Sequence, residues 1–119
     1  MTQRKTRQNE RSSRREKTVD ETIYLSGKRR GAILKHEVWS EAGEVVKYSL
    51  AYIDLRLTTV DNGRVLGYDS SHGQHHRHFM GGVEEVDFVS YEAVLLRFRR
   101  EVEALWRQED ETRKGQDRR

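Results

Sequence analysis

The chain has 119 residues, 34% of them hydrophobic and 36% charged, a composition that fits one small folded domain with a limited core. It has no cysteine, which excludes disulfide frameworks and thiolate chemistry, and no apolar stretch long enough for a signal-peptide core or a membrane span. The expected location is therefore the cytoplasm, away from membranes.

Both ends of the chain lack large apolar groups, because every aromatic residue lies between Tyr24 and Trp106. We expect a single domain at 20–108, a disordered basic arm at 1–19 and a disordered charged tail at 109–119. The arm has seven cations and two carboxylates, a net charge of +5, so the pI near 9.3 comes from the arm. Whether the arm contacts phosphates or only adds solubility stays open.

The first half of the domain predicts strands. A β-prone run at 22–25 turns at Gly27. Two segments with alternating side chains, 32–40 and 45–57, predict strands joined by a turn, and the alternation changes phase at Ile53, which indicates a bulge or break near Tyr52. Three consecutive cations follow the first turn: Lys28, Arg29 and Arg30.

The second half predicts a hairpin and then a long helix. Asn62-Gly63 is a strong hairpin pattern, with 64–70 as the return strand. A helix is expected at 91–108, with Ser90 as its N-cap. Its apolar stripe contains Tyr91, Val94, Leu95, Phe98, Val102, Leu105 and Trp106. The predicted fold class is α+β: a four- or five-stranded antiparallel β-meander with one long C-terminal α-helix packed on it.

The segment HGQHHRHF, residues 72–79, holds four of the five histidines. If 75–79 is extended, His76 and His78 share one face, and His75, Arg77 and Phe79 share the other. A His-x-His pair can bind zinc, but the third ligand would be His72, Asp69 or His36, none at a diagnostic spacing. We therefore expect no metal and no cofactor.

Cleavage of RNA without a metal needs proton-transfer groups and cations near the phosphate, and this segment supplies both. We assign His76 and His78 as the acid–base pair and His75 and Arg77 as phosphate contacts. Tyr68 and Asp69, just upstream, are expected to orient one imidazole. A polar loop whose histidines face water is the alternative. More remote RNA contacts are expected from Lys28, Arg29 and Arg30.

The order of these motifs resembles the TumE-type toxins of bacterial toxin–antitoxin systems, which carry a Tyr-Asp-Asn run and then a His-His-basic-His run followed by a hydrophobic residue. Here LGYDSS and HHRHFMGG match, with Ser70 in place of the asparagine, a shorter spacing and no prolines. The resemblance covers roughly 30–108. The matching residues are Tyr68, Asp69, His75, His76, Arg77, His78 and Phe79.

The resemblance implies a toxin neutralised by a helix-turn-helix antitoxin. By analogy with RelE-like ribonucleases, it also implies an endoribonuclease that cleaves RNA, often messenger RNA in the ribosome. The alternative from another class is a non-catalytic module that binds nucleic acid or a protein partner.

Overall fold

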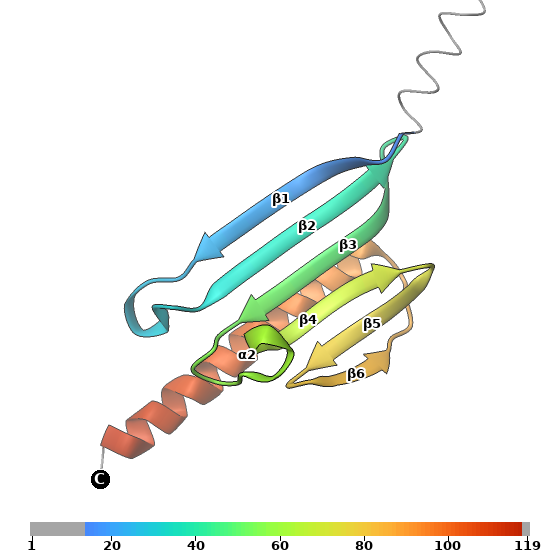
Figure 1. Cartoon of the computed structure of the whole chain (residues 1–119). Coiled ribbons are helices and arrows are strands. Elements are labelled where there is room, and N and C mark those ends of the chain that lie inside the picture. Colours follow the sequence, from blue (N-terminus) through green and yellow to red (C-terminus); the bar gives the residue numbers. More distant parts are fainter. Residues whose placement is uncertain (1–13, 118–119) are drawn as a thin grey trace, which may run out of the picture. The chain divides into compact units, whose positions relative to one another are not determined.

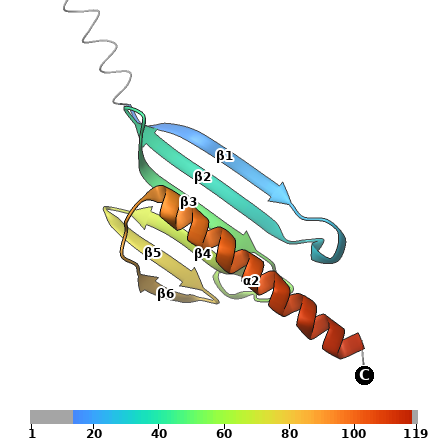
Figure 2. The same cartoon turned by 180° about the vertical axis from the view of Figure 1, so that it is seen from behind.

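The computed structural model of the protein describes residues 14–117. The chain divides into two units, a β-sheet ending at Asp87 and a helical unit beginning at Phe88. The sheet has six antiparallel strands in chain order, so that β1 and β6 form its two edges (Figure 1; Figure 2). The strands are β1 Glu16–Tyr24, β2 Ile33–Glu41, β3 Glu44–Ile53, β4 Arg64–Ser71, β5 Gln74–Phe79 and β6 Gly82–Glu85. The 3-10 helices are η1 Gly27–Arg29 and η2 Val60–Gly63, and the α-helix is α2 Tyr91–Asp117.

The antiparallel meander is confirmed, but the predicted four or five strands are one or two short of the observed six. The strand that escapes prediction is β6, because its four residues are all exposed and show no apolar alternation. Strand β1 begins at Glu16, inside the range expected for the arm, and α2 runs to Asp117, through most of the expected tail. The rest of the predicted arm and tail, 1–13 and 118–119, lies outside the described residues.

Three hairpins close through two-residue turns in which both backbones have positive φ. These pairs are Ala42-Gly43, His72-Gly73 and Met80-Gly81, with φ of 50° and 77°, 51° and 76°, and 49° and 88°. Positive φ at both central positions is typical of the type I′ turn, whose twist matches that of antiparallel strands. The turn expected between the strands at 32–40 and 45–57 is confirmed.

The phase change expected at Ile53 is confirmed, because the β3–β4 register shifts between Tyr52 and Ile53 and β3 ends there. The connection to β4 is a longer loop than the expected tight hairpin. It is anchored by Asp54, only 1% exposed, whose carboxylate accepts hydrogen bonds from the Arg56 Nε at 3.0 Å and Nη2 at 2.8 Å. Burial alone would raise the pKa of Asp54, but the hydrogen bonds from Arg56 outweigh it and lower the pKa.

The register gives the sheet one apolar and one polar face. The residues opposite Tyr68 are Leu50 on β3 and Arg77 on β5, while those opposite Asp69 are Ser49 and His76. The large buried side chains of β2 to β4 share the Tyr68 face, and all are at most 2% exposed: Val38, Tyr48, Leu50, Tyr52, Leu66 and Tyr68. The face that carries Asp69 is the more polar one, with Lys35, Glu37, Ser49, Asp69, His76 and His78 beside Trp39 and Ala51.

Helix α2 starts where the sequence indicates, because the Ala93 backbone N–H donates to the Ser90 Oγ at 3.1 Å. Its buried residues, Val94, Phe98 and Val102, all belong to the predicted apolar stripe, which confirms the buried side of the helix. That the helix packs on the sheet stays a prediction.

Candidate active site

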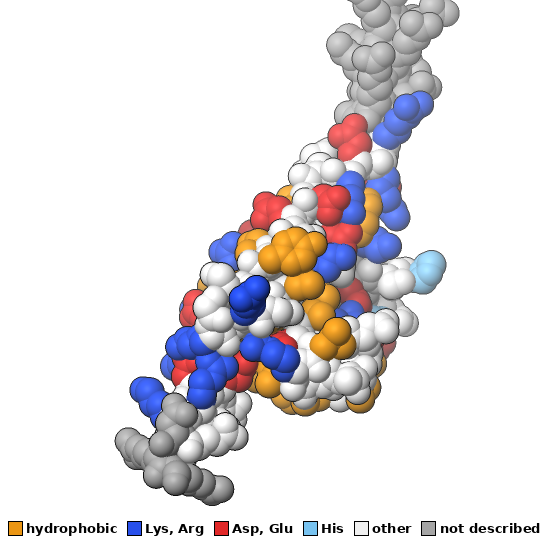
Figure 3. All heavy atoms as spheres, turned by 60° about the vertical axis from the view of Figure 1, so that its left-hand side comes forward, with side chains coloured by type: hydrophobic (Ala, Val, Ile, Leu, Met, Phe, Trp, Pro, Cys, Tyr) orange, Lys and Arg blue, Asp and Glu red, His pale blue; other side chains and the backbone are white. Residues whose placement is uncertain are grey.

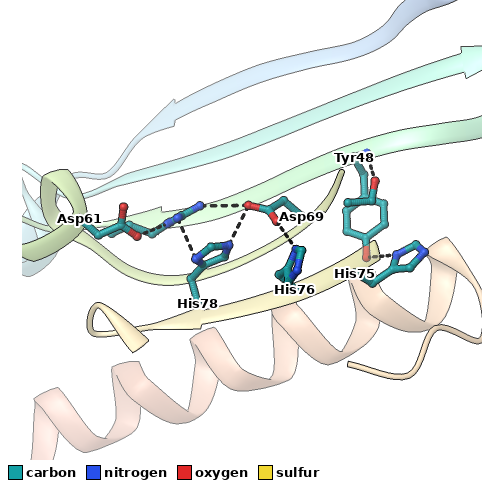
Figure 4. Close-up of polar contacts among 8 residues, drawn as sticks. Tyr48, Asp61, Asp69, His75, His76 and His78 are labelled. Carbon is teal, nitrogen blue, oxygen red and sulfur yellow. Dashed lines mark hydrogen bonds and ion pairs between the residues drawn. The ribbon is translucent and has the colours of Figure 1, made fainter. Parts of the chain in front are cut away.

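Five polar side chains form a connected group on the polar face of the sheet, here called the Asp69 cluster. Its centre is the Asp69 carboxylate on β4, directly opposite His76 of β5 (Figure 4). The Asp69 Oδ2 lies 2.9 Å from the His78 Nε2, and the Oδ1 lies 3.7 Å from the His76 Nδ1. Arg64 completes the centre, since its Nη1 donates to the Asp69 Oδ2 at 3.3 Å. The cluster consists of Asp61, Arg64, Asp69, His76 and His78.

Arg64 fixes the proton on the neutral His78 ring. The Arg64 Nη2 lies 3.0 Å from the His78 Nδ1, and its Nε donates to the Asp61 Oδ2 at 2.7 Å. A guanidinium has only donors, so the His78 Nδ1 must accept, and the ring proton is assigned to Nε2, which faces Asp69. The His78 Nδ1 therefore has a hydrogen-bond partner, while the buried Nε2 lies 2.9 Å from Asp69 without meeting hydrogen-bond geometry, and the side chain is only 14% exposed.

Arg64 reaches this position because Gly67 leaves room for it. Gly67 lies directly opposite His78, and a Cβ built at Gly67 would lie 2.7 Å from the Arg64 Cδ. Glycine inside a strand often marks such a close approach. Sequence reasoning missed Arg64 because it lies at the start of β4, outside the histidine segment; the only pattern that pointed to it was the glycine three residues later.

His76 is the imidazole best placed to exchange a proton with a substrate. Its Nδ1 faces Asp69, its side chain is 23% exposed, and its ring centre lies 6.4 Å from that of His78. Within the described chain its Nε2 has no hydrogen-bond partner. A carboxylate beside one nitrogen favours the protonated form that develops when the other nitrogen takes a proton.

The expectation that His76 and His78 share a face opposite His75 and Arg77 is confirmed by the register. The predicted site residues therefore lie on two opposite faces of the sheet. Tyr68 lies on the face of His75 and Arg77 and is fully buried, so it does not orient His76 or His78.

The residues of the other face have partners of their own. The Arg77 Nη1 donates to the Glu84 Oε1 at 3.3 Å, and its guanidinium lies 5.2 Å from the centre of the Phe79 ring. The His75 Nδ1 lies 2.9 Å from the Tyr48 hydroxyl (Figure 4). Burial, with a smaller effect of Asp69, raises the pKa of Tyr48 to about 12, so its hydroxyl keeps its proton. Burial and the neighbouring His76 lower the pKa of His75.

The three cations predicted to bind RNA more remotely lie at the β1–β2 turn, whereas the Asp69 cluster lies on β4 and β5. Lys28 and Arg29 belong to η1, and Arg30 follows it. On the face seen in Figure 3, acidic and basic side chains are interspersed.

Among residues 14–117, no three or more His, Cys, Asp or Glu side chains are grouped in a way that could hold a metal ion. Over the same residues, no helix combines the length and the hydropathy needed to span a membrane.

A family model described as Toxin TumE matches residues 2–106. The chain belongs to the TumE toxin family. The match begins near the N-terminus, so the similarity to the family extends well before residue 30, where the sequence motifs place its start. Membership implies the toxin role in a toxin–antitoxin system and an antitoxin as partner. No curated protein and no solved structure matches the chain significantly.

Proposed function

We propose that this TumE-family chain is a metal-independent endoribonuclease and that the Asp69 cluster is its active site. The observation that carries the proposal is one carboxylate, Asp69, in contact with His76, His78 and Arg64 at a partly exposed position on the polar face. Proton transfer by an imidazole and stabilisation of developing charge by a cation are the two requirements of metal-free phosphodiester cleavage.

In the proposed reaction, the His76 Nε2 takes the proton of a ribose 2′-hydroxyl. Asp69 stabilises the resulting imidazolium, and the 2′-oxygen attacks the adjacent phosphorus. The bond from phosphorus to the 5′-oxygen breaks, and the leaving oxygen takes a proton from water. The products are a 2′,3′-cyclic phosphate and a 5′-hydroxyl, and His76 returns its proton to solvent.

Arg64 is the proposed phosphate-binding residue of this site. Three of its five N–H groups contact Asp61, Asp69 and His78, so two remain for the non-bridging oxygens of the phosphate. His78 acts as a positioning residue, because its Nδ1 accepts from Arg64 and its buried Nε2 lies 2.9 Å from the Asp69 carboxylate. These roles replace the sequence-based assignment of His78 as half of the acid–base pair.

The substrate class and the partner rest on the resemblance to TumE-type toxins and on the analogy with RelE-like ribonucleases. RNA, including ribosome-bound messenger RNA, is the proposed substrate, a helix-turn-helix protein is the proposed antitoxin, and the cytoplasm is the proposed location.

The deciding experiment incubates the purified full chain with end-labelled RNA, with and without EDTA. Cleavage is expected to survive EDTA, and a substrate with 2′-deoxyribose at the cleaved position should resist. His76→Asn should lower the cleavage rate by about 10²–10⁴-fold and abolish growth inhibition without antitoxin. The matched control is His36→Asn, because His36 lies on the face of the sheet opposite to the Asp69 cluster, and this variant should stay active. Thermal unfolding checks that both variants are folded.

Three other results would contradict the proposal. Cleavage that EDTA abolishes, together with stoichiometric bound metal, would replace the proposal with a metal site. Retention of RNA without cleavage would favour the non-catalytic binding module. Full activity of a well-folded His76→Asn variant would refute the role of His76.

A further inference from the structure

A polar pocket lies at the β4–β5 turn, near the Asp69 cluster. It has a volume of about 250 Å³ and is lined by Arg15, which directly precedes β1, and by residues of β3 and of both arms of the hairpin. The side chains that line it and can contact a ligand are Arg15, Lys47, Ser70, Ser71, His72 and His75.

The lining of this pocket differs in charge from the Asp69 cluster. It contains an arginine, a lysine, two imidazoles and two hydroxyls, and no carboxylate. The Asp69 cluster, in contrast, contains two carboxylates. Glu41 does not line the pocket, but its Oε1 pairs with the Arg15 Nε at 3.2 Å. The Lys47 ammonium lies 4.8 Å from the centre of the Trp39 ring, a contact that leaves its N–H groups able to bind an anion. The pocket therefore favours an anionic ligand.

Two polar groups at the floor of the pocket are held in place by the sheet. The Ser70 Oγ accepts a hydrogen bond from the Tyr48 backbone N–H at 3.1 Å, so its own proton remains available to a ligand. The His75 ring is held through its Nδ1 by the Tyr48 hydroxyl. Because these groups are fixed before a ligand arrives, little conformational entropy is lost on binding.

The pocket is close enough to the Asp69 cluster for one strand of RNA to reach both. Ser71 lies two residues beyond Asp69 on β4, and Lys47 lies two residues before Ser49 on β3, so both belong to the face that carries Asp69, whereas Ser70 and His75 belong to the opposite face. Two pairs along a strand span about 7 Å. We propose that this pocket binds a backbone phosphate of the RNA strand whose neighbouring phosphodiester lies at the Asp69 cluster. The choice of RNA as ligand rests on the proposed function.

The test measures binding of the full chain to a fluorescent 2′-O-methyl oligonucleotide, which has no free 2′-hydroxyl and cannot be cleaved by the proposed reaction. Lys47→Gln should weaken binding about tenfold, the loss of one charged hydrogen bond, and lower the slope of log K against log salt by about 0.7. Lys35→Gln is the matched control, because it removes the same charge from the polar face of β2, outside the pocket. Its affinity should change by less than about twofold.

His72→Asp is a second variant that preserves the turn. Aspartate followed by glycine is well suited to a type I′ turn, so the hairpin should fold, while the new carboxylate repels phosphate. Binding should fall at least as much as in Lys47→Gln. If the two pocket variants bind like Lys35→Gln while all three remain folded, the pocket is not a phosphate site.

The two proposals fail separately in this design. If ordinary RNA is not cleaved but the pocket variants lose affinity for the oligonucleotide, the endoribonuclease proposal is wrong and the phosphate pocket stands. If RNA is cleaved with the expected dependence on His76 but the pocket variants bind normally, the pocket inference alone is overturned.

Discussion

Replacing Asp69 by asparagine tests the central contact of the proposed active site. The carboxylate has two oxygens that contact the His78 Nε2, the His76 Nδ1 and the Arg64 Nη1. Asparagine keeps the size but has one oxygen and an NH₂ group. In either orientation of the amide, a donor therefore faces one of the groups that the carboxylate contacts, and the negative charge opposite His76 is lost.

The expected effect of Asp69→Asn on activity is much larger than its effect on stability. Asp69 is 25% exposed, so loss of its ion pairs should lower the free energy of unfolding by only about 1 kcal/mol. Loss of the charge that stabilises the His76 imidazolium should lower the cleavage rate by about 10²–10⁴-fold, or about 3–5 kcal/mol of activation free energy.

The assay is single-turnover cleavage of end-labelled RNA with enzyme in excess, together with the urea midpoint of each variant. Glu84→Gln is the matched control, since it also converts a carboxylate to an amide, on the neighbouring strand β6, in an exposed pair with Arg77 on the other face. Its rate should stay near that of the wild type. If Asp69→Asn cleaves within about threefold of the wild-type rate while folded, Asp69 does not orient a catalytic histidine.

Three further changes test other parts of the structure. In Gly67→Ala, the new Cβ would displace the Arg64 side chain, so cleavage should slow toward the rate of an Arg64→Gln variant. An unchanged cleavage rate would show that Arg64 does not need the space beside Gly67 to act. Phe98 is only 6% exposed, so Phe98→Ala should lower the free energy of unfolding by about 3–5 kcal/mol, whereas Arg99→Ala, at an exposed position, should change it little. The reverse ranking of the urea midpoints would show that α2 buries a different side. The lowered pKa of His75 means that the unfolded chain binds its proton more readily, so this contribution to stability is complete above about pH 6.5 and is lost as the pH falls below it. Thermal unfolding between pH 7.5 and 5 should therefore show a smaller decrease for His75→Gln than for the wild type, and equal decreases would contradict the assignment.

Local sequence patterns determined much of this protein. The 3.6-residue period identified α2 and its buried side, and Ser90 marked its start, because both depend on residues within a few turns of one another. Period-two alternation gave the strands of the meander and placed His76 and His78 together on one face, since successive side chains of a strand point to opposite faces whatever their partners are. The phase change at Ile53 located the end of β3 for the same reason.

The tertiary structure alone decided which of these side chains meet. Asp69 contacts His76 because the His72-Gly73 turn sets the β4–β5 register, and a shift of one residue would place a different residue opposite Asp69. Arg64 enters the site because Gly67 leaves space above β4, and His75 meets Tyr48 of β3 at hydrogen-bond distance on the other face. These contacts join residues that are distant in sequence or lie on different strands. No periodicity within one segment encodes them, because they depend on the pairing of the strands and on the space between them.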